Sequence, residues 1–365
     1  MGFLCGIVGL PNAGKSTLFN ALTSAGAPAS NYPFCTIEPN VGIVTVPDSR
    51  LDYLAPIVRS AAVVPSVIEF VDIAGLVRGA SNGEGLGNQF LARIREVDAI
   101  AHVIRCFDDP NVAHVDGSVG PVRDIEIVEA ELILKDLETV EHRLADVQRR
   151  AKSGDAKSRS ESEVCEQIRH HLLAGKLARS LGDPGAEGSG YLRDLHLLTA
   201  KPVMYVCNVH EKDASGECDY VRSVRVFAAE AGGKVVTVSA KVESEIAELP
   251  LSERAGYRAS LGLQESGLAT VIRAGYDLLD LVTFFTANER ELHAWTIRRG
   301  TRAPAAAGLI HTDFERGFIR AEVMKFTDIQ HFGSDHGVRE AGLLRLEGKD
   351  YIVGDGDLIY FRFSP

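Results

Sequence analysis

The feature that most constrains this chain's fold lies near its amino terminus, where residues 9–16 read GLPNAGKS. They match the phosphate-binding loop pattern G-x-x-x-x-G-K-[ST] at every fixed position. The apolar residues 3–8 before them predict a short buried strand, and residues 17–22 after them predict a helix. This strand–loop–helix context favours a phosphate-binding loop over a glycine-bearing turn with an exposed lysine.

In such a loop the backbone does most of the binding. Glycines let successive N–H groups point at phosphate oxygens, and the start of the following helix adds a partial positive charge. The Lys15 side chain would reach the terminal phosphates, and the Ser16 hydroxyl would bind Mg²⁺. A phosphate-binding loop alone does not distinguish a kinase, a transporter ATPase and a switch GTPase, so that choice depends on later motifs.

A second motif follows the strand predicted at residues 66–72, which ends in Asp72 and continues as D-x-A-G. An aspartate at the carboxyl end of a strand beside the phosphate-binding loop can hold the hydration shell of Mg²⁺. Gly75 would present a backbone N–H to a γ-phosphate with no side chain in the way. The alternative, a strand that ends in an ordinary turn, is disfavoured by the phosphate-binding loop upstream.

The segment between these motifs, YPFCTIEPN at residues 32–40, contains Thr36. A switch GTPase needs a threonine in this region to complete Mg²⁺ coordination when the triphosphate is bound. Thr36 is therefore a candidate magnesium contact, and a surface loop with an incidental threonine is the alternative. The glycine-rich residues 75–90 predict a segment that orders around a γ-phosphate, or else a flexible loop without that role.

Base selection is predicted at the end of a later strand, residues 202–207, which NVHE follows at residues 208–211. Guanine-specific switches carry N-K-x-D here, and its aspartate accepts hydrogen bonds from guanine. In this chain Val209 replaces the lysine and the longer Glu211 replaces the aspartate, so the motif favours ATP or loose selectivity. A strand at residues 235–238 then leads into an S-A-K loop that would back the base. The candidate base-binding residues are Asn208, Val209, Glu211, Ser239 and Ala240.

Four segments together resemble one known family. They are GLPNAGKS at 9–16, NYPFCTIEPN at 31–40, DIAGLVRGASNGEGLGNQF at 72–90 and NVHE at 208–211. This combination is similar to the YchF subfamily of Obg-related P-loop proteins, the Obg-like ATPases, over nearly the whole chain. The resemblance implies an ATP-preferring hydrolase built on a GTPase fold and associated with ribosomes and translation-related stress responses.

The resemblance also implies roles for individual positions. Phosphate contacts are expected from Asn12, Ala13, Gly14, Lys15, Ser16 and Thr17. Ser16 and Thr36 would hold Mg²⁺ with Asp72, while Asn208, Glu211 and the backbone of Val209 would contact the base. Ala13 stands where valine is common in the family, which should matter little because the backbone does the binding.

The hydrolytic group is less obvious. Many switch GTPases place a water-orienting glutamine directly after D-x-x-G, but this chain has the apolar Leu76 there. The resemblance suggests that a flexible histidine could swing in, and His114, in the polar loop after a strand at residues 101–107, is the candidate; an idle loop histidine is the alternative. Asn12 could also help to seat K⁺ between the phosphates. The predicted catalytic groups are Lys15, Gly75 and His114.

A helical insert is predicted at about residues 125–200. Apolar residues recur at steps of three and four from Ala130 to Val147, and a second helical stretch runs through residues 164–172 after a polar break at 153–155. This spacing predicts an antiparallel hairpin of helices. Basic residues near its tip could bind RNA phosphates or could form an ordinary solvated face; they are Arg143, Arg149, Arg150, Lys152, Lys157 and Arg159.

The chain changes character from about residue 281, where short strand-like runs alternate with turns. We expect strands at 282–286 and 294–297, a long loop containing Pro304 and Gly308, and a strand pair around residues 354–356. This region resembles the TGS module, a ubiquitin-like β-grasp fold of several translation proteins, which implies a binding surface. The predicted fold class is α/β: a P-loop G domain at 1–280, of mostly parallel sheet with flanking helices and the helical insert, and a β-grasp TGS domain at 281–365.

Composition limits the partners and the compartment. A net charge of −11 over 365 residues argues against wholesale coating of nucleic acid. The six cysteines form no C-x-x-C pair, so we expect them reduced in the cytoplasm. We see no signal peptide and no apolar run that could span a bilayer, and we expect no membrane partner. Oxidation of Cys35, beside Thr36, could interfere with Mg²⁺ binding, although a tolerated small residue is the simpler interpretation.

Three functional hypotheses follow. The first is an ATP-hydrolysing switch that docks on ribosomes, with the large subunit as the expected site and RNA contacts through the hairpin and TGS module. It would use ATP and ADP as ligands, with Mg²⁺ and K⁺ as cofactors. The second is a nucleotide-gated binding protein whose turnover is incidental, and the third is a GTPase with relaxed base selectivity.

Overall fold

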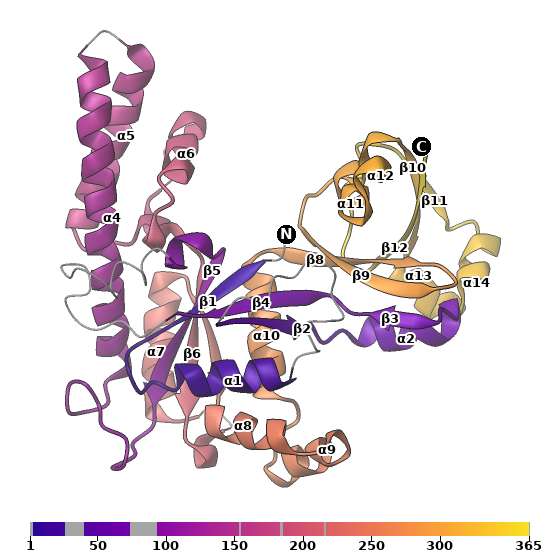
Figure 1. The fold of residues 1–365 in the computed structure, drawn as a ribbon, viewed down its shortest axis with the longest axis horizontal. Coiled ribbons are helices and arrows are strands. Elements are labelled where there is room, and N and C mark those ends of the chain that lie inside the picture. Colours follow the sequence, from indigo (N-terminus) through magenta and orange to yellow (C-terminus); the bar gives the residue numbers. More distant parts are fainter. Residues whose placement is uncertain are drawn as a thin grey trace. The chain divides into compact units, whose positions relative to one another are not determined.

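The computed structural model describes residues 3–25, 40–73, 93–152, 155–182, 185–214 and 217–364. The chain divides into two compact units, each assembled from two stretches of sequence (Figure 1). The first unit contains residues 1–43 and 69–275, and the second contains residues 44–68 and 276–365. The chain therefore leaves the first unit within the strand Val41–Thr45 and re-enters it within the strand Val67–Asp72.

The first unit is built on a six-stranded sheet with the order β2-β4-β1-β5-β6-β7. Its strands are β1 (Leu4–Val8), β2 (Val41–Thr45), β4 (Val67–Asp72), β5 (Ala99–Cys106), β6 (Val203–Val209) and β7 (Lys234–Val238). The pairs β1–β4, β1–β5, β5–β6 and β6–β7 are parallel. Because parallel strands share one direction, the carboxyl ends of β1, β4, β5, β6 and β7 meet at one edge of the sheet.

Helices and short 3₁₀ turns connect these strands and complete the unit's core. They are α1 (Lys15–Ala25), α4 (Pro121–Ala151), α5 (Ala156–Leu173), η3 (Ala178–Ser180), α6 (Gly185–Asp194), η4 (Leu198–Ala200), η5 (Glu211–Asp213), α7 (Asp219–Ala231), α8 (Ala240–Glu248), α9 (Leu251–Ser260) and α10 (Gly267–Leu278). Strands β5 and β6 are buried along their whole length, as their continuous apolar runs require for central strands of a parallel sheet. Among the described residues, no helix combines the length and the apolar character needed to cross a bilayer.

The predicted helical hairpin is formed by α4 and α5, which lie side by side (Figure 1). Its seam contains the expected apolar side chains of α4, including Val140, Leu144 and Val147, against Val164, Ile168 and Leu172 of α5. Asp155 caps α5 by accepting a hydrogen bond from the Lys157 N–H at 3.2 Å.

Part of the basic cluster near the hairpin's tip is already neutralised. Arg143 and Arg150 both pair with Glu161, at 2.5 and 3.7 Å, and Arg149 pairs with Asp146. Within the described part of the chain, Lys152, Lys157 and Arg159 form no ion pair. The tip therefore presents fewer unpaired cations than the sequence suggests.

The second unit contains a mixed sheet with the order β11-β10-β12-β8-β9-β3. Its elements are α2 (Ser49–Val58), β3 (Ala62–Val64), β8 (Leu281–Ala287), β9 (Glu291–Arg298), α11 (Ala303–Ile310), α12 (Thr312–Arg316), β10 (Phe318–Lys325), α13 (Phe326–Phe332), α14 (Asp335–Glu340), β11 (Arg345–Glu347) and β12 (Asp357–Phe363). Strand β12 runs parallel to β8, whereas β8–β9 and β10–β12 are antiparallel. A terminal strand inserted parallel to β8, the first strand of residues 276–365, with a helix packed on the sheet, is the β-grasp arrangement.

Two local expectations for this unit are wrong. The segment with Pro304 and Gly308 is helix α11 and not a long loop, because Ala303, Ala306 and Ala307 bury a small-residue face in the core. Residues 350–353 form no strand with β12; Ile352 makes only an isolated bridge to Arg302. Strand β12 is already paired on both sides, with β10 and β8, and has no edge left for a hairpin partner.

Residues 44–68 lie in the second unit, although the division at residue 280 assigned them to the amino-terminal domain. Strand β3 extends the β-grasp sheet by pairing with β9, and α2 packs against the same strand. Arg50 strengthens this attachment, because its guanidinium contacts both Asp48 and Asp355 at 2.7 Å. Asp355 in turn accepts a hydrogen bond from the Thr283 N–H at 2.9 Å.

Asp136 on α4 fixes the return of the hairpin to the sheet. Its buried carboxylate accepts hydrogen bonds from the N–H groups of Leu198 and Thr199, at 2.7 and 2.8 Å, and from the Thr199 hydroxyl at 2.6 Å. We expect Asp136→Ala to lower the free energy of unfolding by about 3 kcal/mol, because it leaves buried donors without an acceptor. Urea denaturation followed by circular dichroism measures this change. Asp146→Ala, at an exposed position of the same helix, should cost less than about 0.5 kcal/mol; equal losses for the two variants would contradict the assignment.

Candidate nucleotide-binding site

The loop between β1 and α1 has the backbone that phosphate binding requires. Gly14 adopts φ +97°, and a Cβ there would lie 2.2 Å from Asn208 Nδ2. A Cβ at Gly9 would lie 2.4 Å from the carbonyl oxygen of Val103 on β5. Both positions therefore exclude side chains, because the loop passes directly against its neighbours.

Lys15 is placed to serve this loop. Its side chain is buried, and its ammonium donates a hydrogen bond to the Leu10 carbonyl oxygen at 2.9 Å. Burial lowers the pKa of Lys15, and the nearby charge of Asp72 opposes that shift. A desolvated ammonium held across the loop gains favourable partners when phosphate oxygens arrive.

Ser16 and Asp72 form a set of oxygen donors beside Lys15. The Ser16 hydroxyl donates to Asp72 Oδ2 at 3.2 Å, and the other carboxylate oxygen, Oδ1, is buried without a hydrogen-bond partner. Burial raises the pKa of Asp72, with the Ser16 hydrogen bond and the Lys15 charge acting against it. A hydroxyl beside an incompletely satisfied carboxylate fits the hard ligands that Mg²⁺ prefers. The other expected contacts here, Thr36 and Gly75, lie outside the described residues, as does Cys35.

A cavity of about 350 Å³ opens next to the phosphate-binding loop. Its walls come from the loops that follow β1, β5, β6 and β7, all at the carboxyl edge of the parallel sheet. The structure thus brings together the predicted phosphate and base residues from widely separated parts of the chain. The lining residues are Asn12, Gly14, Thr17, Phe107, Asp109, Val112, Asn208, Val209, His210, Glu211, Ser239, Ala240 and Lys241.

Asn208 joins three of these loops. Its side-chain amide donates to the Ala13 carbonyl oxygen at 2.9 Å, and its Oδ1 accepts from the Ala240 N–H at 3.0 Å. The neighbouring Ser239 hydroxyl is buried without a hydrogen-bond partner and lines the cavity. Asn208 therefore builds the pocket, and Ser239 offers a polar group to an occupant.

Glu211 and Lys241 face each other at the cavity's rim. Their side chains form an ion pair at 2.9 Å, and the hydrogen bond from Lys241 lowers the pKa of Glu211. The carboxylate predicted to contact the base is thus already engaged by a cation. Lys241 lay in the predicted S-A-K loop, but its contact with Glu211 depends on the tertiary fold.

The sequence prediction missed Arg105 on β5. This buried guanidinium donates to the carbonyl oxygens of Phe107, Asp109 and Val112 at 3.1, 3.2 and 2.9 Å. It also lies over the Phe107 ring, 4.8 Å from the centroid. Arg105 therefore shapes the loop that forms one wall of the cavity. The available signal in the sequence was an arginine within a strand that is apolar except for this residue and His102.

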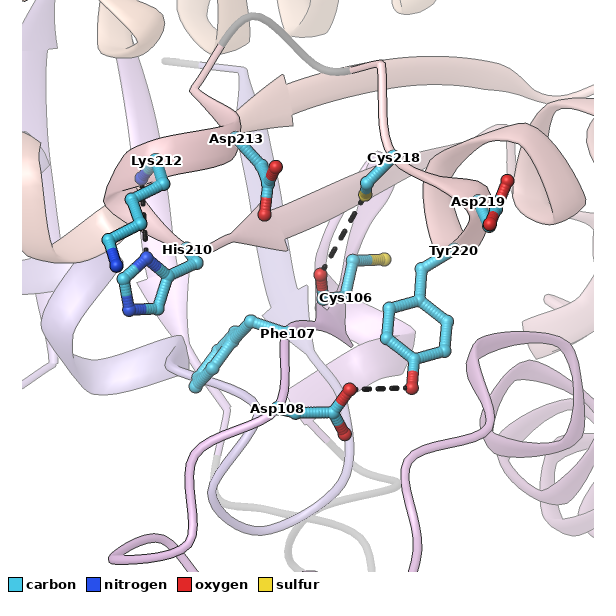
Figure 2. Close-up of a pocket in the computed structure, with 9 residues that line it drawn as sticks. All are labelled: Cys106, Phe107, Asp108, His210, Lys212, Asp213, Cys218, Asp219 and Tyr220. Atoms are coloured by element: carbon cyan, nitrogen blue, oxygen red, sulfur yellow. Dashed lines mark hydrogen bonds between the residues drawn. The ribbon is translucent and has the colours of Figure 1, made fainter.

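A second cavity, of about 620 Å³, adjoins the first and shares Phe107 and His210 with it. Figure 2 shows its lining, with the Tyr220 hydroxyl donating to Asp108 Oδ2 at 2.9 Å. This bond raises the pKa of Tyr220 and ties the loop after β5 to helix α7. Cys106 and Cys218 lie in the same cavity as free thiols, as predicted; the described cysteines form no disulfide.

The His114 side chain is only 6% exposed in this structure. Its Nε2 lies 2.9 Å from Asp124 Oδ2, and its Nδ1 accepts the Asp116 N–H at 3.1 Å. The preceding residue, Ala113, accepts a hydrogen bond from Asn12 Nδ2 at 3.1 Å. The loop that carries His114 is therefore anchored to the phosphate-binding loop, while the imidazole itself is held by α4.

Comparison with known proteins agrees with this geometry. The family profile YchF-GTPase_C, described as "Protein of unknown function (DUF933)", matches residues 281–364, and MMR_HSR1, described as "50S ribosome-binding GTPase", matches residues 4–142. A protein named ribosome-binding ATPase YchF from Escherichia coli O157:H7 is 54% identical over 364 residues, covering 100% of both chains. This chain belongs to the YchF family.

Further relatives extend the likeness beyond bacteria. A protein named Obg-like ATPase 1 from Oryza sativa subsp. japonica is 47% identical over 362 residues, covering 98% of this chain and 91% of the relative. The solved structure of the Schizosaccharomyces pombe YchF GTPase superposes with a TM-score of 0.88 at 37% identity, covering 99% of this chain and 98% of that one. The P-loop G-domain fold with its carboxy-terminal β-grasp module is therefore established for this chain.

Arg105 provides a test of how the cavity wall is held. We expect Arg105→Ala to accelerate amide hydrogen exchange at residues 107–114 by about tenfold or more, because the carbonyl groups of the loop lose their shared donor. Hydrogen exchange followed by mass spectrometry measures the effect. Arg105→Lys should give an intermediate result, since one ammonium cannot reach carbonyls that the planar guanidinium spans. Unchanged exchange in the alanine variant would contradict this role.

Proposed function

We propose that this YchF-family chain binds and hydrolyses ATP with Mg²⁺ and acts as a nucleotide-dependent switch on the ribosome. The observation that carries the proposal is the convergence of a complete phosphate-binding loop, an oxygen ligand set and a base-sized cavity at one sheet edge. The names of the relatives, which include ribosome-binding ATPase, support both parts of the function.

The preference for ATP over GTP follows from the rim of the base pocket. Guanine needs a free carboxylate to accept from its N1 and N2 groups, but Glu211 is paired with Lys241 at 2.9 Å. The position that carries lysine in guanine-specific switches is Val209, which offers only its backbone. Adenine has no N1–H to donate, so its binding free energy does not depend on a free carboxylate at this position.

We assign individual roles as follows. The backbone from Asn12 to Thr17 and the Lys15 ammonium bind the phosphates, while Asn208, Val209, Glu211, Ser239 and Ala240 form the base site. Ser16, Asp72 and Thr36 would hold Mg²⁺, which supplies charge neutralisation for the β- and γ-phosphates when bound. The Gly75 N–H would contact the γ-phosphate, and His114 would orient the attacking water. Asn12 could contribute an oxygen ligand to K⁺.

The partner surfaces belong to the same proposal. The protein would be cytoplasmic and would contact the large subunit through the hairpin and the TGS module. Lys152, Lys157 and Arg159, near the hairpin's tip, would contact RNA phosphates. The description "50S ribosome-binding GTPase" for the family matched by residues 4–142 supports the choice of subunit. In functional terms the chain would divide into a G domain at 1–280 and a TGS domain at 281–365. Residues 44–68 add to the sheet of the second unit.

Calorimetric titration with ATP, ADP, GTP and GDP, each with Mg²⁺, tests the nucleotide assignment. We expect adenine nucleotides to bind at least about tenfold more tightly than guanine nucleotides, a difference of about 1.4 kcal/mol. Lys15→Met should abolish measurable binding of the triphosphates while leaving the fold intact. Tighter binding of GTP than ATP would contradict the base assignment, and no adenine-nucleotide binding at all would contradict the proposal.

Ribosome-stimulated turnover separates the switch from the second candidate, a nucleotide-gated binding protein. If ribosomes accelerate hydrolysis, chemistry is part of the cycle. If ribosome affinity depends on the bound nucleotide but turnover never rises, the binding-protein interpretation is correct. Titrations of ribosomes into protein saturated with ATP, and separately with ADP, report both quantities: turnover in the first, and the ribosome affinity of each nucleotide state.

Asp72→Asn tests the metal site in two conditions. Because burial raises the pKa of Asp72, its ionised form is unfavourable without a cation, so the variant should be as stable as the wild type or slightly more stable at pH 8. This advantage should shrink as the pH falls and the wild-type carboxyl becomes protonated. With Mg²⁺ and ATP at 100 times Kd, the wild type should gain about 2.7 kcal/mol, and the variant should lose most of that gain.

Thermal unfolding with and without Mg²⁺ and ATP measures both effects. Asp194→Asn, at an exposed position of the first unit, is the matched control. It should change neither the stability of the free protein nor the gain with Mg²⁺ and ATP. A variant at position 72 that keeps the full Mg²⁺-dependent gain would remove Asp72 from the metal site.

A further inference from the structure

We propose that Asp124, on the first turn of hairpin helix α4, holds His114 in an inactive position, and that release of this contact controls hydrolysis. The inference rests on the proposed function, because it takes His114 as the water-orienting group. It adds a positioning residue and a physical link from the helical insert to the site.

The contact is closed and dry. His114 Nε2 lies 2.9 Å from Asp124 Oδ2, and the two side chains are only 6% and 5% exposed. Asp124 is fixed by its own helix, since its N–H donates to the Gly120 carbonyl oxygen at 2.9 Å. An isolated charge in such a place would be costly, so the hydrogen-bonded pair is a strong local constraint.

In this arrangement neither ring nitrogen of His114 is free to accept a proton. Its Nδ1 accepts the Asp116 N–H at 3.1 Å, which assigns the proton to Nε2, and Nε2 donates to Asp124. An imidazole that orients or deprotonates water needs an unshared ring nitrogen facing that water. His114 must therefore leave Asp124 before it can act.

Charge around the pair favours the closed form. The Arg123 guanidinium lies 3.5 Å from Asp116 and 3.4 Å from Asp124, and it also donates to the Ser118 hydroxyl at 3.2 Å. His114, Asp116 and Asp124 match metal ligands by type and spacing, but this guanidinium already supplies the positive charge at both carboxylates. We therefore assign the cluster to holding His114 and not to a metal ion.

The position of Asp124 gives the contact a means of control. Helix α4 has 31 residues, a length of about 46 Å, and its far half packs with α5 to form the hairpin. The loop carrying His114 is anchored next to that residue, because Asn12 and Arg105 both donate hydrogen bonds to the carbonyl oxygen of Ala113. A partner that shifts α4 relative to this anchored loop would separate Asp124 from His114. A ribosome bound to the hairpin would thus activate hydrolysis.

The first test compares single-turnover ATP hydrolysis, with and without 70S ribosomes, in the wild type and in Asp124→Asn. The substitution replaces a charge-assisted hydrogen bond with a weaker neutral one, so basal hydrolysis should rise by roughly five- to tenfold. The Kd for ATP should stay within about twofold, since Asp124 does not line the nucleotide cavity. Stimulation by ribosomes should shrink by a similar factor. Glu126→Gln, an exposed acid-to-amide change on the same helix turn, should alter none of these quantities.

Three outcomes separate this inference from the proposed function. If His114→Ala abolishes hydrolysis and the double variant Asp124→Asn/His114→Ala matches it, the effect of Asp124 passes through His114. If His114→Ala hydrolyses ATP at the wild-type rate, the proposed role of His114 fails. If His114→Ala is inactive but Asp124→Asn has an unchanged or lower basal rate, the role of Asp124 is overturned.

A second measurement needs no variant. Diethyl pyrocarbonate modifies exposed imidazoles, and mass spectrometry reports each site. In the nucleotide-free wild type, His114 should react at least about tenfold more slowly than His336, whose side chain is 77% exposed. Ribosomes with a non-hydrolysable ATP analogue should abolish this protection at His114. Equal reactivity of the two histidines in the free protein, or protection that persists on the ribosome, would overturn the proposal.

Discussion

Two hydrogen bonds from one amide side chain hold the nucleotide site together. Asn208 donates to the Ala13 carbonyl oxygen at 2.9 Å and accepts from the Ala240 N–H at 3.0 Å. These contacts join the phosphate-binding loop to two loops about two hundred residues later in the sequence, and they place that loop at a fixed distance from the base pocket. The contact is so close that Gly14 must lack a side chain. The phosphate-binding loop and the base pocket can bind the same ligand because Asn208 sets the distance between them.

The loop after β5 depends on a comparable constraint. Arg105 gathers its carbonyl groups, Asn12 fastens it to the phosphate-binding loop, and Tyr220 ties it to α7 through Asp108. The same loop carries His114, whose imidazole contacts Asp124 at the base of the helical hairpin. A series of hydrogen bonds thus connects the site with the helical hairpin. It gives the YchF fold a route for coupling turnover to a partner without any contact between that partner and the nucleotide.

Much of the fold was predictable from the sequence because the signals were local. Strands β1, β4 and β6 and the two hairpin helices have strong apolar patterns, and each lies close to its expected position. The failures involve segments whose structure depends on distant residues. Helix α11 carries Pro304 in its first turn, where proline is compatible with a helix, and it buries alanines in the β-grasp core. Strand β12 pairs with β10 and β8 and not with the neighbouring residues 350–353. Residues 44–68 join the second unit because β9 offers them an edge and Asp355 offers Arg50 a partner.

The sequence by itself determined the class of ligand, because the groups that bind phosphate are contiguous backbone amides, one lysine and one hydroxyl whose spacing follows directly from the motif. It also predicted which residues after β6 and β7 would lie together beside that loop, since the carboxyl ends of these strands share one edge of the sheet. Only the tertiary structure decided that Glu211 is engaged by Lys241, that Arg105 shapes the pocket wall and that His114 is held by Asp124. These contacts join side chains from separate loops and helices, and their distances depend on how the whole unit packs.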